Sequence, residues 1–391
     1  MLKLTIPIII QNLLSAAVNS ADVIMLNYVG QSAISAVSLA ANYSNILFMV
    51  YYGLGTGASL LCAQYFGKNN MQAIHAIEGI ALRFSIIISG IVALIAFTAP
   101  QLMMKIFTSD QELISIGSSY LRIMGITYLC WGITEIYLAI LRSIGRVTIS
   151  MALNMLAFIL NIILNATFIF GLFGAPKLGA TGVAIATVIS QMISCILVLR
   201  CLYQTQGSYQ LRFSKLAIKG EYVGQIFQVG VPAGIQSTVI NFSNVLLQSS
   251  VNSFGSIAMA GYTAANNIFG FLYVSVNSIT QACMSFTSQN YGAGRKKRMD
   301  RVLLECMLLS VVSALILGSS AYLFGPEILR IYTTDPAVIA CGMEIMLYTT
   351  VTYFLCGLMD LFPGALRGMG HSAVPMILSV IGTVGTRIVW I

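Results

Sequence analysis

The chain has 391 residues, of which 58% are apolar and only 8% are charged, and its mean hydropathy is +0.87. Soluble domains carry about 25% charged residues, so this composition excludes a soluble domain, a disordered chain and a coiled coil. The net charge is +8, but the basic residues stand in short gaps between apolar runs, which favours membrane orientation over nucleic-acid binding. We expect an all-α integral membrane protein, with the lipid bilayer and no nucleic acid as its partner.

Apolar runs along the chain predict about eleven membrane spans, since about 20 helical residues cross a hydrocarbon core of about 30 Å. The runs lie at about 4–26, 35–61, 76–99, 113–141, 148–173, 178–203, 224–250, 257–287, 302–324, 337–364 and 374–391. The last run has no polar flank, and an unpaired backbone end is unfavourable in lipid. We therefore expect a C-terminally truncated chain whose complete form has a twelfth helix.

Basic residues between the runs predict the orientation of the chain. The N-terminus and the even-numbered gaps contain Lys3, Lys68, Arg142, Arg146, Arg200, Arg212, Lys215, Lys219, Arg295, Lys296, Lys297, Arg298, Arg301 and Arg367. The odd-numbered gaps contain Lys105, Lys177 and Arg330. This asymmetry predicts a cytoplasmic N-terminus in a multi-pass protein of the plasma membrane.

The two halves of the sequence match at one fixed offset of 225 residues. The matched pairs include Pro7 with Pro232, Gln11 with Gln236, Asn42 with Asn267, Gln64 with Gln289, Asp110 with Asp335 and Arg142 with Arg367. Because an even number of spans separates them, the two six-helix repeats run parallel. We predict an N-terminal lobe over 1–203, a cytoplasmic linker over 204–223 and a C-terminal lobe over 224–391 that lacks its last helix. This duplication is typical of secondary transporters that work by alternating access.

The first span carries four polar residues on one helical face, Asn12, Ser15, Asn19 and Asp22. Ionisable groups inside a span are expensive, and they are functional candidates by default. Pro7 can kink the same helix and is a candidate hinge. We expect Asp22 to be functional, and a carboxylate held in a static hydrogen-bond network is the alternative.

The fifth span adds Asn161 and Asn165, four residues apart, which can donate to an ionised Asp22 or help to coordinate a cation. Tyr120 in the fourth span and Thr187 in the sixth can complete this cation-coupling cluster, although each alone also fits ordinary helix packing. Na⁺ is possible at Asp22, Asn161 and Thr187. Beyond a proton or Na⁺ as coupling ion, we expect no metal and no cofactor.

Polar residues of the second half are candidates for a substrate cavity. Besides Asn19, the candidates are Asn241, Asn244 and Gln248 of the seventh span and Glu344 of the tenth. The stripe in the seventh span fits either a cavity wall or hydrogen bonds between helices, whereas Glu344 can attract a cationic substrate. Glu135 and Asp360, which match at the repeat offset, each lie seven residues before an arginine (Arg142 and Arg367) on the same helix face, which favours internal ion pairs over contact with substrate.

Several segments carry a family resemblance, and they occur in a specific order: ADVIMLNYVG (21–30), AQYFGKNN (63–70), NIILNATFIFG (161–171), GATGVAIAT (179–187), SQNYGAGR (288–295) and ALRGMG (365–370). With them the chain resembles the multidrug and toxic compound extrusion (MATE) family over essentially its whole length. The resemblance implies a twelve-helix antiporter that exports amphipathic, usually cationic compounds in exchange for protons or sodium. It also implies a cation site at Asp22, Asn161, Tyr120 and Thr187. Members commonly have a second aspartate where this chain has Asn165, and its loss should weaken sodium binding.

We therefore expect a monomeric antiporter that exports amphipathic, cationic drugs or toxins in exchange for protons, with Asp22 as the coupling carboxylate. One alternative is a lipid-linked oligosaccharide flippase of the same superfamily. A flippase would need a basic cavity for pyrophosphate, for which Arg122 and Arg387 are the candidates. A remote alternative is an intramembrane enzyme, but the two histidines, His75 and His371, fall at predicted cytoplasmic ends, so we expect no enzyme.

Overall fold

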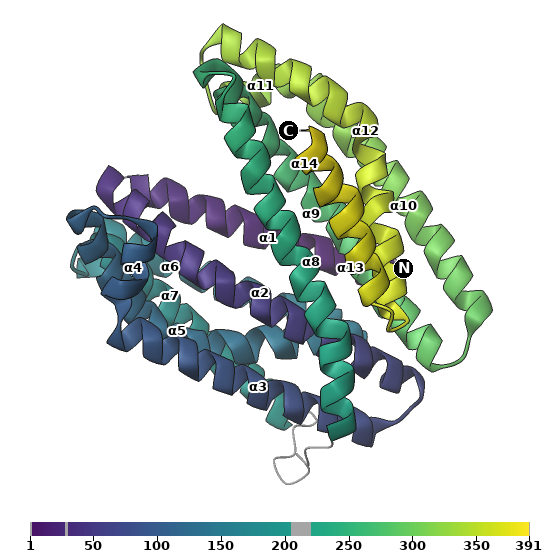
Figure 1. The fold of residues 1–391 in the computed structure, drawn as a ribbon. Coiled ribbons are helices and arrows are strands. Elements are labelled where there is room, and N and C mark those ends of the chain that lie inside the picture. The colour runs from purple at the N-terminus through teal and green to yellow at the C-terminus, as the bar shows by residue number, and fades with distance from the viewer. Residues whose placement is uncertain (1, 28–29, 205–219, 391) are drawn as a thin grey trace. The chain divides into compact units, whose positions relative to one another are not determined.

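The computed structural model describes residues 2–27, 30–204 and 220–390, apart from the side chains at 2–4, 19–24, 26–27, 31, 173 and 204. This part of the chain folds into helices and turns, without a strand (Figure 1). The long helices are α1 Leu2–Asn27, α2 Gln31–Gly67, α3 Met71–Thr98, α5 Gln111–Ser143, α6 Val147–Phe170, α7 Gly179–Gln204, α8 Gly220–Asn252, α9 Ser256–Gly292, α10 Lys296–Leu323 and α12 Pro336–Gly368. A last helical segment comprises α13 Ala373–Ser379, the π-helical turn η3 Val380–Gly385 and α14 Thr386–Trp390.

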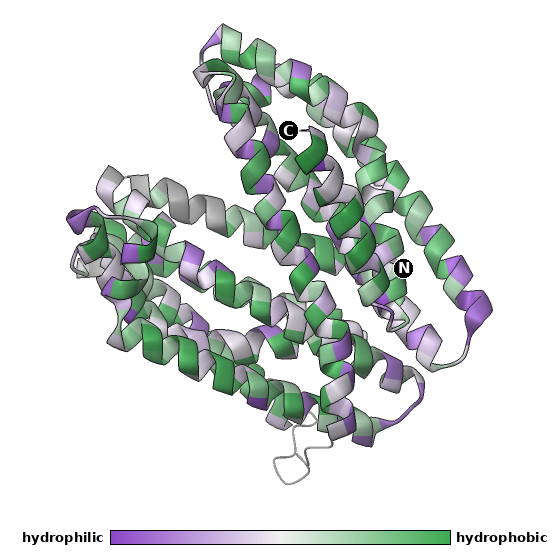
Figure 2. Ribbon diagram, viewed as in Figure 1, coloured by the Kyte–Doolittle hydropathy of each residue, from purple (hydrophilic) through white to green (hydrophobic). Residues whose placement is uncertain are grey.

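The lengths and polarity of these helices fit a multi-pass membrane protein. Among the described residues, 8 helices are long and apolar enough to cross a membrane. Figure 2 shows apolar residues along the helices and hydrophilic residues gathered at the helix ends and turns. The helices α8 and α9 are longer than a bilayer core requires, but polar residues lower their hydropathy. The all-α membrane fold is therefore confirmed.

Helix boundaries repeat at the offset that the sequence predicts. The bounds of α2, α3 and α5 each return 225 residues later as those of α9, α10 and α12. The turns repeat as well, because Asp110 and Asp335 both cap their helices by accepting a backbone N–H bond of 2.9 Å. Gly30 and Gly255 precede α2 and α9 with φ of +131° and +98°, a conformation that favours glycine. The chain is therefore an internal duplication.

The hydropathy pattern did not predict two short helices. The helix α4 Pro100–Phe107 follows α3, and α11 Gly325–Arg330 follows α10 at the corresponding place. In both, a proline stands in the first turn, where its missing N–H is not needed. Because α4 is only 8 residues long, it cannot cross the bilayer and lies at the end of a span.

The described chain divides into two compact units. Unit 1 contains residues 1–13 and 232–391, and unit 2 contains residues 14–231. The chain therefore changes unit twice within a helix, after Leu13 in α1 and before Pro232 in α8. Pro232 has no N–H to donate within the helix, which weakens α8 at that point. The predicted lobes, 1–203 and 224–391, stay a prediction, since residues 205–219 of the linker lie outside the described residues.

Each unit has its own apolar core. In unit 2, α5 packs against α2, α3 and α7, and the core includes the fully buried Tyr128 and Tyr137. In unit 1, α9, α10 and α12 pack together around Met346 and Leu361. Each core thus fixes the polar side chains of its own helices in place.

The helices α2 and α8 cross at glycines within unit 2. A Cβ atom added at Gly57 would clash with the carbonyl oxygen of Ile226, and one added at Gly230 would lie 2.5 Å from the carbonyl oxygen of Gly53. Small residues allow this backbone approach, which is how helices pack closely in lipid. The crossing therefore fixes the first part of α8 to unit 2 directly before Pro232.

We predict that Gly57→Ala lowers the thermal unfolding midpoint in detergent. Overpacking at a tight contact costs about 1–3 kcal/mol, which exceeds the gain of up to about 1 kcal/mol from replacing a helical glycine. Gly90→Ala is the matched control, because nothing lies within 4 Å of a Cβ atom there, and it should leave stability unchanged or raise it. An equal change in both variants would contradict the close crossing.

Candidate functional site

The helix α6 positions the predicted asparagines on its buried face. Asn161 and Asn165 are 7% and 0% exposed, in line with the buried Ala157 and Ile169. The opposite face carries exposed apolar residues, Leu156, Ile159 and Ile163. The spacing of four residues therefore turns both amides into the protein, while the apolar side chains face outward.

The amide of Asn161 connects α6 with α7. Its Nδ2 donates to Thr187 Oγ1 and to Ser190 Oγ, each at 3.3 Å, and its Oδ1 accepts from Asn165 Nδ2 at 3.0 Å. The hydroxyl groups use their own protons within α7, since Thr187 donates to the carbonyl of Val183 and Ser190 to that of Thr187. We call Asn161, Asn165, Thr187 and Ser190 the amide–hydroxyl cluster. It has fixed donor and acceptor directions and no charge of its own.

The structure thus brings together three of the predicted cation-coupling residues, and it adds Ser190. The signal for Ser190 was present in the sequence, because Thr187, Ser190 and Ser194 are spaced by three and four residues and form one face of α7. Tyr120 of α5 is 8% exposed and packs in the same apolar core as Val183 and Ala184, which precede Thr187. Its predicted place in the cation-coupling cluster stays a prediction.

For two of the predicted residues of the first span, the structure describes the backbone but not the side chain. The backbone of Asn19 and Asp22 is helical in α1, but their side chains lie outside the described residues, so their predicted roles stay predictions. Asn12, on the same predicted face, donates from Nδ2 to Ser278 Oγ of α9 at 2.9 Å. Pro7 lies inside α1. The predicted polar face of α1 therefore begins in unit 1, and its Asp22 end belongs to unit 2.

The predicted cavity stripe of α8 separates into different roles. Asn244 Oδ1 and Ser243 Oγ accept from Arg387 Nη1 of α14, at 2.7 and 3.2 Å. Asn241 donates to the carbonyl oxygen of Ser237 in its own helix and is exposed. Gln248 and Glu344 are also exposed. Asn244 thus holds two helices together, which is one of the two predicted alternatives, and contact of the other residues with substrate stays a prediction.

A second polar network replaces the predicted ion pair of α12. Tyr273 Oη donates to Asp360 Oδ2 at 2.6 Å, and Arg367 donates to Gln236 Oε1, so Asp360 and Arg367 do not form a contact within 4 Å. The predicted pair is not formed as a direct contact, because seven residues separate the two side chains by about 10 Å along a helix. Arg367 nevertheless still attracts Asp360 electrostatically. Asn277 and Gln281 extend the network along α9, and their spacing of four residues was the signal that sequence reasoning missed.

These features define a class of protein. The described chain is a duplicated, all-helical, multi-pass membrane protein with hydrogen-bonded polar networks inside its spans. The MatE family model matches residues 7–167 and again residues 232–390, and the two matches begin at the equivalent Pro7 and Pro232. The chain belongs to the MatE family. Its members are membrane transporters, so the chain is a transporter and not an enzyme.

Curated relatives and solved structures agree with this family. The chain is 24% identical over 389 residues to "Probable multidrug resistance protein YoeA" of Bacillus subtilis, covering 98% of this chain and 84% of that protein. It is 25% identical to "Probable multidrug resistance protein NorM" of Thermotoga maritima, covering 97% and 82%. A solved MOP superfamily transporter from Pyrococcus furiosus has a TM-score of 0.91 at 20% identity, covering 100% of this chain and 87% of that one. At this identity the structural likeness shows the fold alone.

We predict that Asn161→Leu lowers the thermal unfolding midpoint. Leucine has a similar size, but it leaves the hydroxyl oxygens of Thr187 and Ser190 and the amide of Asn165 without this partner, at a cost of about 1–3 kcal/mol. Thr167→Val is the matched control on α6, because Thr167 is bonded to its own helix at an outward position. It should change stability by less than about 0.5 kcal/mol. Equal midpoints for the two variants would show that the cluster does not stabilise the unit.

Proposed function

We propose that the chain is a secondary antiporter that exports amphipathic, cationic compounds in exchange for protons. The observation that carries the proposal is the MatE match over both repeats, together with relatives that are named multidrug resistance proteins. We further propose that it acts as a monomer in the plasma membrane with a cytoplasmic N-terminus, as the distribution of basic residues predicts.

The composition of the amide–hydroxyl cluster favours a proton over Na⁺ as the coupling ion. Its oxygens belong to amides and hydroxyl groups and are all neutral. At Asn165, where the resemblance leads one to expect a carboxylate, this chain has an amide that donates to Asn161. Hard cations prefer several oxygen ligands that include carboxylates. With Asp22 as the single carboxylate among the predicted cation-coupling residues, the site suits a group that binds and releases one proton.

In the proposed mechanism, Asp22 is the group that gains and loses the proton. For a carboxyl group within a membrane span, a low-dielectric environment favours the neutral form and hydrogen-bond donors favour the carboxylate. We propose that Asp22 responds to pH through this balance. Protonation from outside removes the charge, releases the hydrogen bonds to the carboxylate and lets α1 shift near Pro7. The substrate then leaves while the proton is carried inward.

The path of α1 supports this use of Asp22. Residues 2–13 of the helix belong to unit 1, where Asn12 is bonded to Ser278, and the rest of the helix belongs to unit 2. A change of charge at Asp22 therefore acts on a helix that is shared by both units. One proton moving inward across 100 mV supplies about 2.3 kcal/mol, enough for about fifty-fold export of a neutral compound. When one monovalent cation leaves for each proton, no net charge moves, and only the pH difference drives the exchange.

We predict that Asp22→Asn abolishes pH-driven efflux. Purified protein in vesicles loaded with an ethidium-like dye would be given a proton gradient or a sodium gradient, each alone, and dye loss would be recorded. Asp110→Asn is the matched control, because asparagine caps a helix as well as aspartate does and should preserve transport.

Three outcomes would overturn parts of this proposal. Wild-type pH-driven efflux in Asp22→Asn removes Asp22 from the mechanism. Efflux driven by the sodium gradient alone assigns the coupling ion to Na⁺, with Asp22, Asn161 and Thr187 as ligands. Dye retention under both gradients, together with movement of a pyrophosphate-linked lipid, favours the flippase.

A further inference from the structure

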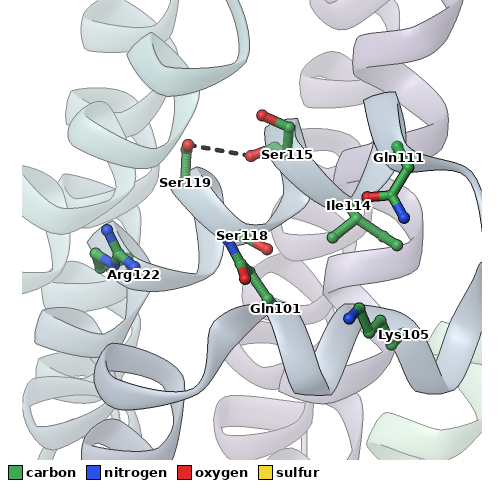
Figure 3. Close-up of a pocket in the computed structure, with 8 residues that line it drawn as sticks. All are labelled: Gln101, Lys105, Gln111, Ile114, Ser115, Ser118, Ser119 and Arg122. Carbon is green, nitrogen blue, oxygen red and sulfur yellow. Dashed lines mark hydrogen bonds between the residues drawn. The ribbon is translucent and has the colours of Figure 1, made fainter.

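A polar cavity of about 210 Å³ lies in unit 2 between α4 and the first turns of α5. It is lined by Gln101 and Lys105 of α4 and by Gln111, Ile114, Ser115, Ser118, Ser119 and Arg122 of α5 (Figure 3). All but one of these residues are polar, two are cationic and none is acidic. The cavity is separate from the amide–hydroxyl cluster, and the proposed function does not use it.

A buried hydroxyl group in this cavity has no partner. Ser118 is 6% exposed, and its Oγ forms no hydrogen bond with any part of the chain that the structure describes. The neighbouring Ser119, by contrast, donates to the carbonyl oxygen of Ser115 at 3.1 Å (Figure 3). Other buried hydroxyl groups also have no partner among the described residues, and Ser118 is the one among them that lines this cavity. If its side chain turns toward the cavity, a ligand that accepts a hydrogen bond would satisfy it.

The two cations of the cavity, Lys105 and Arg122, are exposed and have no carboxylate partner among the described residues. Within the described ranges, no carboxylate lies within 4 Å of Lys105 or Arg122, since the ion pairs there are His75 with Glu78 and Arg301 with Glu305. The nearby Asp110 carboxylate accepts the backbone N–H of Glu112 as a helix cap. An ammonium, a guanidinium and a hydroxyl group together form a set of donors that suits the oxygens of a phosphate.

The surroundings of the cavity identify the source of the phosphate. On α4, Leu102 and Ile106 are 61% and 69% exposed and flank Lys105 in the sequence. The helix α5 has 33 residues, about 50 Å, and exceeds the hydrocarbon core, so its first turns reach the lipid headgroups. Exposed apolar side chains beside a cationic cavity fit acyl chains below a headgroup, whereas a soluble phosphate would gain nothing from them.

We propose that this cavity binds the headgroup of an anionic phospholipid. Lys105 and Arg122 bind its phosphate oxygens, Ser118 donates a hydrogen bond to one of them, and the acyl chains lie along Leu102 and Ile106. Basic groups near a membrane surface attract anionic headgroups. By the orientation that the basic residues predict, this cavity faces the outer leaflet.

The second repeat provides an internal contrast. By the 225-residue offset, Lys105 corresponds to Arg330, but Ser118 corresponds to Met343 and Arg122 to Leu347. The fold therefore does not require the polar residues of the cavity. Arg330 is an exposed cation at the end of α11 without the two accompanying donors, and it serves as the matched control.

The test uses the purified full chain, freed of lipid in detergent. Phosphatidylglycerol, phosphatidylcholine and inorganic phosphate are titrated separately, and bound lipid is measured by native mass spectrometry together with the thermal unfolding midpoint. We expect saturable binding of phosphatidylglycerol that raises the midpoint. The Lys105→Gln/Arg122→Gln double variant should bind about 100-fold more weakly, about tenfold for each charge-assisted contact. Ser118→Ala should bind several-fold more weakly, and Arg330→Gln should match the wild type.

Correct folding of each variant is checked by its midpoint in phosphatidylcholine, and Lys105→Gln alone replaces the double variant if the latter does not fold. Equal loss of binding in Arg330→Gln, or no loss in the cavity variants, would overturn the site. Binding of inorganic phosphate that needs the same residues, without any preference for phosphatidylglycerol, would assign the cavity to a soluble anion and overturn the lipid.

Discussion

In a lipid solvent, a buried polar group without a partner inside the protein is costly, and the rest of this structure depends on that constraint. The amide of Asn161 meets it with bonds to Thr187, Ser190 and Asn165, and these bonds tie α6 to α7. Both amides are buried, so a partner lost there is not easily replaced by solvent. We propose that this sensitivity lets a change of charge nearby be coupled to a movement of helices.

The duplication gives both repeats the same arrangement of long helices, whereas their polar residues differ. The long helices α2, α3 and α5 return at the same offset as α9, α10 and α12, down to the capping aspartates. The side-chain hydrogen-bond networks of the described residues, by contrast, do not recur at this offset. Unit 2 has the amide–hydroxyl cluster, whereas unit 1 has the Asp360–Tyr273 pair and Arg387 held by Asn244. The two repeats thus share a scaffold but offer different chemistry, which favours a different role for each lobe in the transport cycle.

Much of the fold could be predicted from the sequence, because span length and repeat offset are one-dimensional properties. The helices of the membrane fold followed from apolar runs, and the duplication from pairs such as Pro7 and Pro232. The helix α4 was missed because its 8 residues are too short for a hydropathy window. Partners between distant helices could not be predicted either. Asp360 was assigned to Arg367 on its own helix, but its hydrogen bond comes from Tyr273 of α9, 87 residues away. The change of unit within α1 and α8 likewise depends on tertiary packing.

The central proposal is that one carboxylate, Asp22, takes up the coupling proton and that the Asn161 amide interacts with it. Infrared difference spectroscopy of the reconstituted protein during a drop in external pH tests it most directly, because it detects the carbonyl stretch of a newly protonated carboxyl group. The account predicts such a band in the wild type, its loss in Asp22→Asn and a shifted frequency in Asn161→Leu. A band that neither substitution alters would contradict it.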